Sequence, residues 1–176
     1  MPQLVAPSVA LTGAFIFPPT DSVDDHAPRR EAARTFTAYA VLVGNLGLLL
    51  PTDTASTMIE DGLPFCPLPN TPVWLRGMAN YYGNVIPIFD LETLLEFPSP
   101  GRAESKVLFI GEGEVAVGIT VAAPPVRVHL STANAMSGRL PLPPIIQPYV
   151  RAYYKSARVW VDWDVRAFFM AVGERI

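Results

Sequence analysis

The sequence has little charge of either sign, one cysteine and two histidines. Its 176 residues include 13 lysines and arginines and 16 aspartates and glutamates. The single cysteine, Cys66, excludes an intramolecular disulfide and fits a reducing compartment. His26 and His129 lie far apart with no cysteine or carboxylate at ligand spacing, so we expect no metal site. The basic residues form no cluster, which argues against nucleic acid as a partner.

The sequence also lacks a segment that would direct it to or through a membrane. The apolar start "MPQLVAPSVALTGAFIF" has no basic residue before Arg29, so the charged beginning of a signal peptide is missing. The run "YAVLVGNLGLLLP" is too short to span a bilayer and is interrupted by glycine and asparagine. We therefore expect a cytoplasmic protein without direct membrane insertion.

Half of the residues are hydrophobic, and 19 prolines and 12 glycines are spread along the chain, which is typical of a packed domain of short strands and turns. The segments 39–51 and 106–121 each consist of two apolar runs around a glycine-containing turn, the pattern of a β-hairpin. Short helices are predicted at 90–97 and 164–172, each beginning with an aspartate that can cap it. The sequence thus predicts an all-β domain of barrel type with short helices.

Two segments, 74–95 and 149–169, resemble copies of each other. Their alignment pairs Arg76 with Arg151, Val85 with Val159, Phe89 with Trp163, Asp90 with Asp164, and Leu94-Leu95 with Phe168-Phe169. A repeat of this length predicts two similar small barrels. We expect residues 1–30 to be an N-terminal extension and linker, residues 31–176 to form the domain, and the two barrel subdomains to meet near 98–105.

Two motifs are similar to catalytic sites but lack essential parts. "PTDTAST", around Asp53, has Ala55 where an aspartic protease has glycine, and the chain contains no second copy. "GEGEVAVG" lacks the lysine and hydroxyl residue of a phosphate-binding loop. Asp90 and Asp164 could be imagined as an acid–base pair, but their equivalent repeat positions favour helix capping. We expect no catalytic residue and no cofactor.

The stretch "LPNTPVWLRGMANYYGNVIPIFDLETLL" resembles the signature of the CheW-like domain. The landmarks that match are Leu68, Pro69, Asn70, Pro72, Trp74, Gly77, Asn80, Gly83, Ile86, Pro87, Asp90 and Leu91. The similarity in order and spacing extends over about residues 39–170. This resemblance implies a fold of two small interlocked SH3-like β-barrels, each of five strands.

The resemblance also implies an adaptor without catalytic activity. Such adaptors couple the cytoplasmic tip of a methyl-accepting receptor to the regulatory domain of a histidine kinase. One domain with an N-terminal extension is similar to the adaptors of pilus-linked (twitching) chemosensory systems, with flagellar chemotaxis as the other output. The alternative is a sensor that binds a small molecule or peptide in the groove between the barrels.

The resemblance places the partner-binding residues around one turn: Arg76, Gly77, Asn80, Tyr81, Tyr82, Gly83 and Asn84. In the family, Gly77, Asn80 and the position of Tyr82 belong to the region that contacts the receptor. Tyr82 departs from the family pattern, which has arginine at this position. The change removes a bidentate charged contact, although tyrosine is itself frequent in interfaces. We expect Asn80 to serve the turn through backbone hydrogen bonds and Trp74 to fill the same architectural slot as Tyr149.

Overall fold

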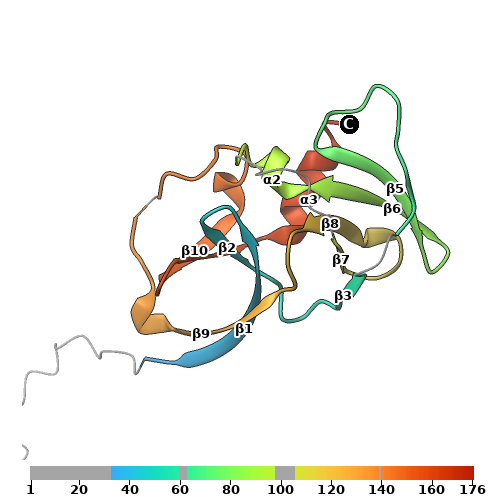
Figure 1. The fold of residues 1–176 in the computed structure, drawn as a ribbon. Coiled ribbons are helices and arrows are strands. Elements are labelled where there is room, and N and C mark those ends of the chain that lie inside the picture. Colours follow the sequence, from blue (N-terminus) through green and yellow to red (C-terminus); the bar gives the residue numbers. More distant parts are fainter. Residues whose placement is uncertain (1–32, 60–62, 98–105, 139) are drawn as a thin grey trace, which may run out of the picture. The chain divides into compact units, whose positions relative to one another are not determined.

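The computed structural model describes residues 33–59, 63–97, 106–138 and 140–176 (Figure 1). The predicted N-terminal extension and the predicted junction at 98–105 lie outside the described residues. Within the described ranges the chain forms two β-sheets with short helices, which confirms the predicted fold class. None of the described helices is long and apolar enough to cross a membrane.

The first sheet, which we call barrel A, has five strands. Their order across the sheet is β10 (Val150–Lys155), β11 (Val159–Trp163), β2 (Leu46–Leu49), β1 (Thr35–Val43) and β9 (Val126–Ser131). Neighbouring strands are antiparallel except β11 and β2, which are parallel. After β9 the chain returns to β10, where the Met136 N–H donates to the Tyr153 carbonyl at 2.8 Å. Small and apolar side chains such as Ala38, Ala40 and Leu130 fill the interior.

The second sheet, barrel B, repeats this plan. Its order is β3 (Ser56–Ile59), β7 (Lys106–Ile110), β8 (Val117–Val121), β6 (Asn84–Asp90), β5 (Leu75–Tyr81) and the two-residue β4 (Phe65–Cys66). Here β6 and β8 are the parallel pair. The short 3-10 helix η1 (Gly113–Val115) lies between β7 and β8. Ile86, Ile88 and Phe109 are among the buried side chains of the interior.

The two predicted copies have the same local structure. In each, a strand with a bulge pairs with a second strand, and an aspartate at the end of that second strand or directly after it caps a helix: α2 (Leu91–Leu94) or α3 (Val165–Gly173). Asp90 accepts a hydrogen bond from the Thr93 N–H at 3.1 Å and Asp164 from the Ala167 N–H at 3.0 Å, which confirms the predicted caps.

Each capping aspartate also faces the arginine of its own copy. Arg76 lies 3.9 Å from the Asp90 carboxylate and Arg151 lies 2.7 Å from that of Asp164. The Ala167 N–H and the Arg151 guanidinium lower the pKa of the Asp164 carboxyl, because both stabilise its charged form. The repeat in the sequence is therefore also a repeat of one structural arrangement, in which an aspartate caps a helix and pairs with an arginine.

The two barrels each combine strands from both halves of the chain, before and after residues 98–105. Barrel A takes β1 and β2 from the N-terminal half of the chain and β9–β11 from the C-terminal half, whereas barrel B takes β3–β6 from the N-terminal half and β7 and β8 from the C-terminal half. Residues 98–105 thus connect α2 to β7, and both β6 and β7 belong to barrel B. The reason is that one strand of each early hairpin pairs in parallel with a strand of the other half of the chain: β2 of the β1–β2 hairpin with β11, and β8 of the β7–β8 hairpin with β6.

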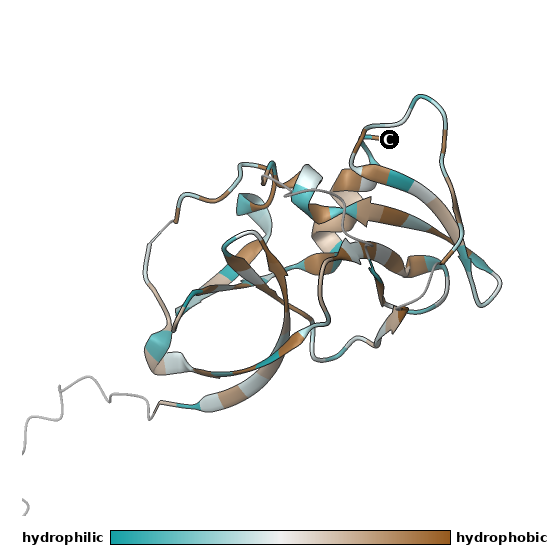
Figure 2. Ribbon diagram, viewed as in Figure 1, coloured by the Kyte–Doolittle hydropathy of each residue, from teal (hydrophilic) through white to brown (hydrophobic). Residues whose placement is uncertain are grey.

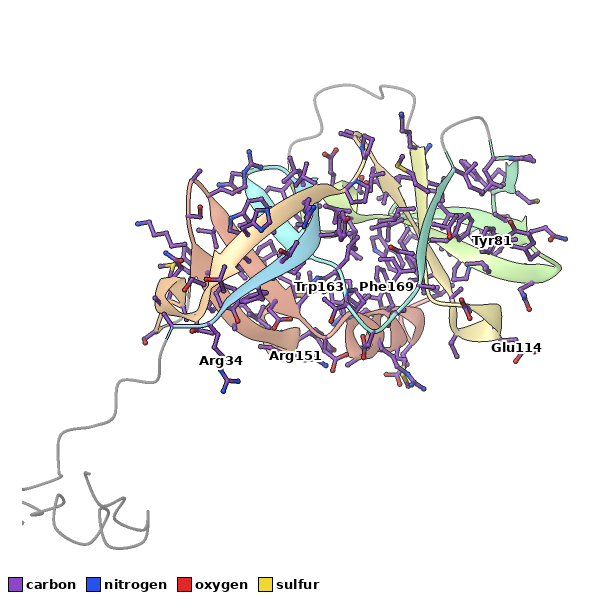
Figure 3. All side chains as sticks on the ribbon, turned by 90° about the horizontal axis from the view of Figure 1, so that it is seen from below. Arg34, Tyr81, Glu114, Arg151, Trp163 and Phe169 are labelled. Carbon is purple, nitrogen blue, oxygen red and sulfur yellow. The ribbon has the colours of Figure 1, made fainter. Side chains whose placement is uncertain are left out.

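An apolar core joins the barrels. Hydrophobic residues gather in α3 and in the strands beside it (Figure 2). Trp163 and Phe169 lie in the middle of the molecule (Figure 3), with ring centroids 6.0 Å apart. The Trp163 indole N–H donates to the Leu49 carbonyl at 2.9 Å, so this buried polar group is satisfied by β2, a strand of the N-terminal half of the chain.

Because each barrel needs strands from both sides of 98–105, we expect neither half of the chain to fold alone. Residues 1–97 would leave β1–β2 and β6 without their parallel partners and expose the core that they cover. Circular dichroism of residues 1–97 and 106–176, expressed separately, should show unfolded chains, and co-expression should restore a folded complex.

The matched control is the full chain with an engineered protease site within 98–105, cleaved after folding. Its two fragments should stay together on size-exclusion chromatography, because the exchanged strands still connect them. A stable, folded N-terminal half would contradict the exchange.

Candidate functional site

The hairpin of β5 and β6 carries most of the predicted partner-binding residues at its tip. Tyr81 pairs with Asn84, leaving Tyr82 and Gly83 as a two-residue turn. Their φ angles are +49° and +84°, and two positive values in succession are the mark of a type I′ turn, where asparagine and glycine are preferred. The left-handed conformation costs a tyrosine about 1 kcal/mol relative to the right-handed region.

Asparagine side chains hold this turn. The Gly83 N–H donates to Asn80 Oδ1 at 3.0 Å, and the Asn84 side-chain amide donates to the Tyr82 carbonyl at 3.5 Å. Asn80 therefore serves the turn, as expected from its position. These bonds fix the backbone on either side of Tyr82, so the direction of its side chain is set by the turn.

The two adjacent tyrosines have different roles in the fold. Tyr81 stacks on Phe109 of barrel B, with ring centroids 4.0 Å apart and an interplanar angle of 12°. Tyr82 meets the Tyr81 ring edge-on at 4.7 Å, and 87% of Tyr82 is exposed. Tyr81 is thus an anchor at the end of the barrel, and Tyr82 is a large aromatic side chain presented to solvent.

Two exposed valines accompany Tyr82 at this end of the molecule. Val85 on β6 is 67% exposed and Val115 in η1 is 70% exposed. The parallel pairing of β6 and β8 sets Ile88 opposite Gly118. The helix η1, which carries Val115, packs against β6, the strand of Val85. We call Tyr82, Val85 and Val115 the tip surface.

A cleft of about 230 Å³ opens next to the tip surface, at the mouth of barrel B. Its lining includes both tyrosines, Asn84, Thr57 of β3 and Glu112. Apart from the tyrosine rings, these side chains offer oxygen atoms that can accept hydrogen bonds, and no lysine or arginine is among the lining residues.

Arg76 and Gly77 lie at the other end of β5, away from the tip. Arg76 pairs with Asp90 and its guanidinium is 5.9 Å from the centre of the Phe65 ring. Gly77 is buried and has a φ of +138°, and a Cβ added to it would collide with the Cys66 carbonyl. The structure therefore brings five of the seven predicted residues together, while Gly77 provides the close approach of β4 to β5.

Sequence reasoning missed Val85, Val115, Glu112 and Thr57. Alternation along β6 offered a signal for Val85, because Ile86 and Ile88 on the opposite face are buried and Val85 is exposed. No comparable signal existed for Val115 and Glu112, which lie in the glycine-rich stretch interpreted as a plain hairpin turn. They lie between β7 and β8, and the fold brings this segment against β6 and the cleft.

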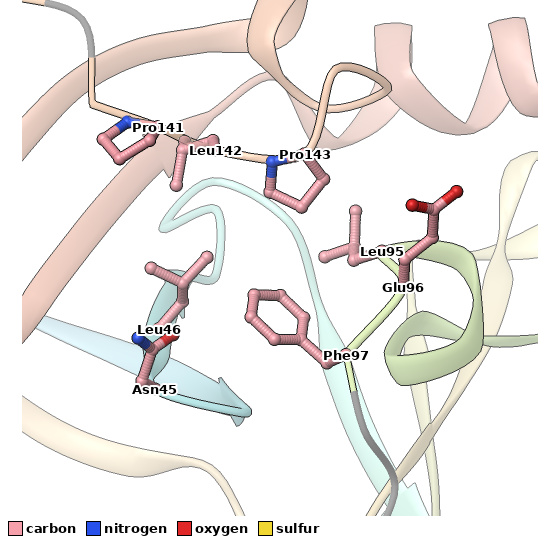
Figure 4. Close-up of a pocket in the computed structure, with 8 residues that line it drawn as sticks. All are labelled: Asn45, Leu46, Leu95, Glu96, Phe97, Pro141, Leu142 and Pro143. Carbon is pink, nitrogen blue, oxygen red and sulfur yellow. The ribbon is translucent and has the colours of Figure 1, made fainter.

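A second cleft, of about 410 Å³, lies between the β1–β2 turn, the end of α2 and residues 141–143 (Figure 4). Leucine, phenylalanine and proline side chains dominate its lining, and the Glu96 carboxylate is directed away from them. Binding sites for small molecules combine such a lining with a few convergent polar groups. Within the described residues, no three histidine, cysteine or acidic side chains come together to hold a metal ion.

Comparison with known proteins gives three findings. A family model described as the CheW-like domain matches residues 40–170. The chain is 22% identical to Protein PilI of Pseudomonas aeruginosa over 146 residues, 82% of each chain, and 33% identical to Protein FrzA of Myxococcus xanthus over 85 residues, 46% of this chain and 51% of FrzA. The crystal structure of the scaffolding protein TtCheW from Thermoanaerobacter tengcongensis matches with a TM-score of 0.63 at 15% identity, over 80% of this chain and 96% of that one.

Replacing Gly77 and Gly83 by alanine should separate their roles. Gly77→Ala should lower the free energy of unfolding by about 2–4 kcal/mol, because the added Cβ collides with backbone and the φ is strained. Gly83→Ala meets no atom within 4 Å and should cost only about 1 kcal/mol for its φ. Urea unfolding of both variants measures the difference. Equal losses would show that Gly77 is not a packing glycine.

Proposed function

The chain belongs to the CheW-like domain family, and from this membership we propose how it works as a chemosensory adaptor that couples a methyl-accepting receptor to a histidine kinase. The tip surface binds the regulatory domain of a CheA-type kinase, and a separate part of the molecule is left for the cytoplasmic tip of the receptor. Similarity to PilI supports a pilus-linked (twitching) output rather than a flagellar one. The adaptor works in the cytoplasm, where the receptor tip lies.

The exposure of Tyr82 is the observation that carries this proposal. Tyr82 has an unfavourable backbone conformation, and among the described aromatic residues its ring packs on Tyr81 alone. Tyr82 therefore adds little to the stability of the free protein. Tyrosine is enriched among the residues that dominate binding energy in interfaces. Val85 and Val115 extend the apolar surface beside it, as the centre of a small interface requires.

We assign the predicted site residues to three different roles. Tyr82, Gly83 and Asn84 contact the partner, and Asn80 and Tyr81 hold the tip in place. Arg76 and Gly77 act at a distance, by fixing the start of β5 against Asp90 and β4. A small interface centred on the tip surface is suited to reversible, micromolar binding.

Members of the CheW family are non-catalytic scaffold proteins, and we propose the same for this chain. Asp53, the residue with a protease-like setting in the sequence, is exposed and accepts a hydrogen bond from the Thr54 hydroxyl at 3.3 Å. An aspartic protease site needs a second carboxylate to share its proton.

Tyr82→Ala should weaken binding of the kinase regulatory domain about tenfold, because it removes the aromatic centre of the interface. Its melting temperature should stay within about 2 °C of the wild type, since the ring is exposed. Isothermal titration calorimetry measures the affinity. Met170→Ala on α3, another exposed apolar residue, is the matched control and should bind normally.

Two outcomes would count against the proposal in different ways. A wild-type chain that binds neither the kinase domain nor the receptor tip encoded with it would remove the adaptor mechanism. Normal binding by Tyr82→Ala would keep the adaptor and reject the tip surface as its contact.

A further inference from the structure

The mouth of barrel B is acidic. Glu112 lines the cleft and Glu114 of η1 follows it, both of them exposed. The Gly111 N–H donates to the Ala55 carbonyl at 2.9 Å, which holds the loop before β3 against the loop after β7. None of the residues that line the cleft carries a positive charge.

The exposed basic side chains of the described chain lie mainly on barrel A: Arg34, Arg127, Arg151, Lys155 and Arg158. Figure 3 shows Arg34 and Arg151 toward one end of the molecule and Tyr81 and Glu114 at the other. In barrel B, Arg76 is held by Asp90, and Lys106 begins β7 at the end remote from Gly111. Within the part of the chain that the structure describes, the lining of the mouth therefore carries acidic charge and no basic side chain.

The cleft also has the chemistry that suits a positively charged side chain. The rings of Tyr81 and Tyr82 stand at 72° to each other, and aromatic faces attract ammonium and guanidinium groups. The Glu112 carboxylate supplies the opposite charge, and the oxygens of Thr57 and Asn84 can accept hydrogen bonds from N–H groups. A volume of about 230 Å³ admits one long side chain and excludes a folded segment.

We propose that this cleft receives an arginine or lysine side chain of the adaptor's protein partner, with apolar partner residues around it covering Val85 and Val115. The proposal rests on the proposed function, because it names the chemistry of the partner that binds the tip surface. Tyr82 is the determinant. An arginine at this position, as in the family pattern, would bring its own cation to the acidic cleft, whereas tyrosine leaves the cleft acidic and adds an aromatic wall.

The experiment titrates two probes into the full chain by calorimetry: the kinase regulatory domain and the cytoplasmic receptor fragment encoded with this adaptor. Tyr82→Phe keeps the ring and should bind within about twofold of the wild type. Tyr82→Arg and Glu112→Lys place a cation in the cleft and should each weaken binding of the kinase regulatory domain about tenfold or more, since like charges in contact oppose association. Binding of the wild type should also weaken as salt is raised.

Glu174→Lys is the matched control, because it makes the same change of charge at an exposed acid beyond α3 and should leave the affinity unchanged. All of the variants replace exposed side chains, so their melting temperatures check that the fold is intact. A charge swap gives the strongest support: a partner with one basic residue changed to glutamate should bind Glu112→Lys better than it binds the wild type.

Tighter binding by Tyr82→Arg would overturn the proposal, because it would show an acidic partner. A neutral Glu112→Lys, with the wild type bound, would also overturn it while leaving the adaptor mechanism intact. Concentration-dependent self-association that Glu112→Lys abolishes would identify a second copy, docked through barrel A, as the occupant and reject a separate partner. If the wild type binds neither probe, the adaptor mechanism fails and this inference fails with it.

Discussion

The exchange of strands between the two halves of the chain is the constraint on which the rest of the structure depends. Strands of the N-terminal half pair with strands of the C-terminal half in both barrels: β2 with β11 and β1 with β9 in barrel A, and β6 with β8 and β3 with β7 in barrel B. The β2–β11 and β6–β8 pairs are parallel. Both contacts are close: Gly47 leaves room for the Trp160 ring, and Gly118 leaves room for Ile88. The barrels are thus interlocked, and their shared core of α2, α3 and the facing strands follows from that connection.

The rigidity of the hairpin tip derives from the same arrangement. Tyr81 is stacked on Phe109 of β7, a strand of the C-terminal half of the chain, while the β5–β6 hairpin belongs to the N-terminal half. Asn80 and Asn84 then fix the turn from within. A side chain that projects from such a support loses little further freedom on binding, which favours affinity from a small contact area.

Local features could be predicted from the sequence because neighbouring residues determine them. The aspartate caps, the hairpins and the repeat of aromatic, strand and helix each depend on a few adjacent positions, and Asp90 and Asp164 perform the expected role. The exchange of strands between the two halves of the chain could not be predicted. A repeat gives the order of the strands along the sequence, but it does not say which half supplies the partner of each strand. For the same reason Val115 and Glu112 were missed: they lie between β7 and β8, about 30 residues along the chain from the turn, and only the folded structure brings them to it.

The departure at Tyr82 changes the chemistry of a surface without changing its support. Arginine and tyrosine are both long, and at an exposed turn either can be carried by the hydrogen bonds of Asn80 and Asn84, which involve the backbone of the turn and not the side chain at position 82. The exposed side chain therefore costs the fold little when it varies, but it decides whether the mouth of barrel B meets its partner with a positive charge or with an aromatic ring beside acids. In such an interlocked scaffold the side chain at position 82 can vary without disturbing the packing glycines and the aspartate caps, because these lie elsewhere in the chain.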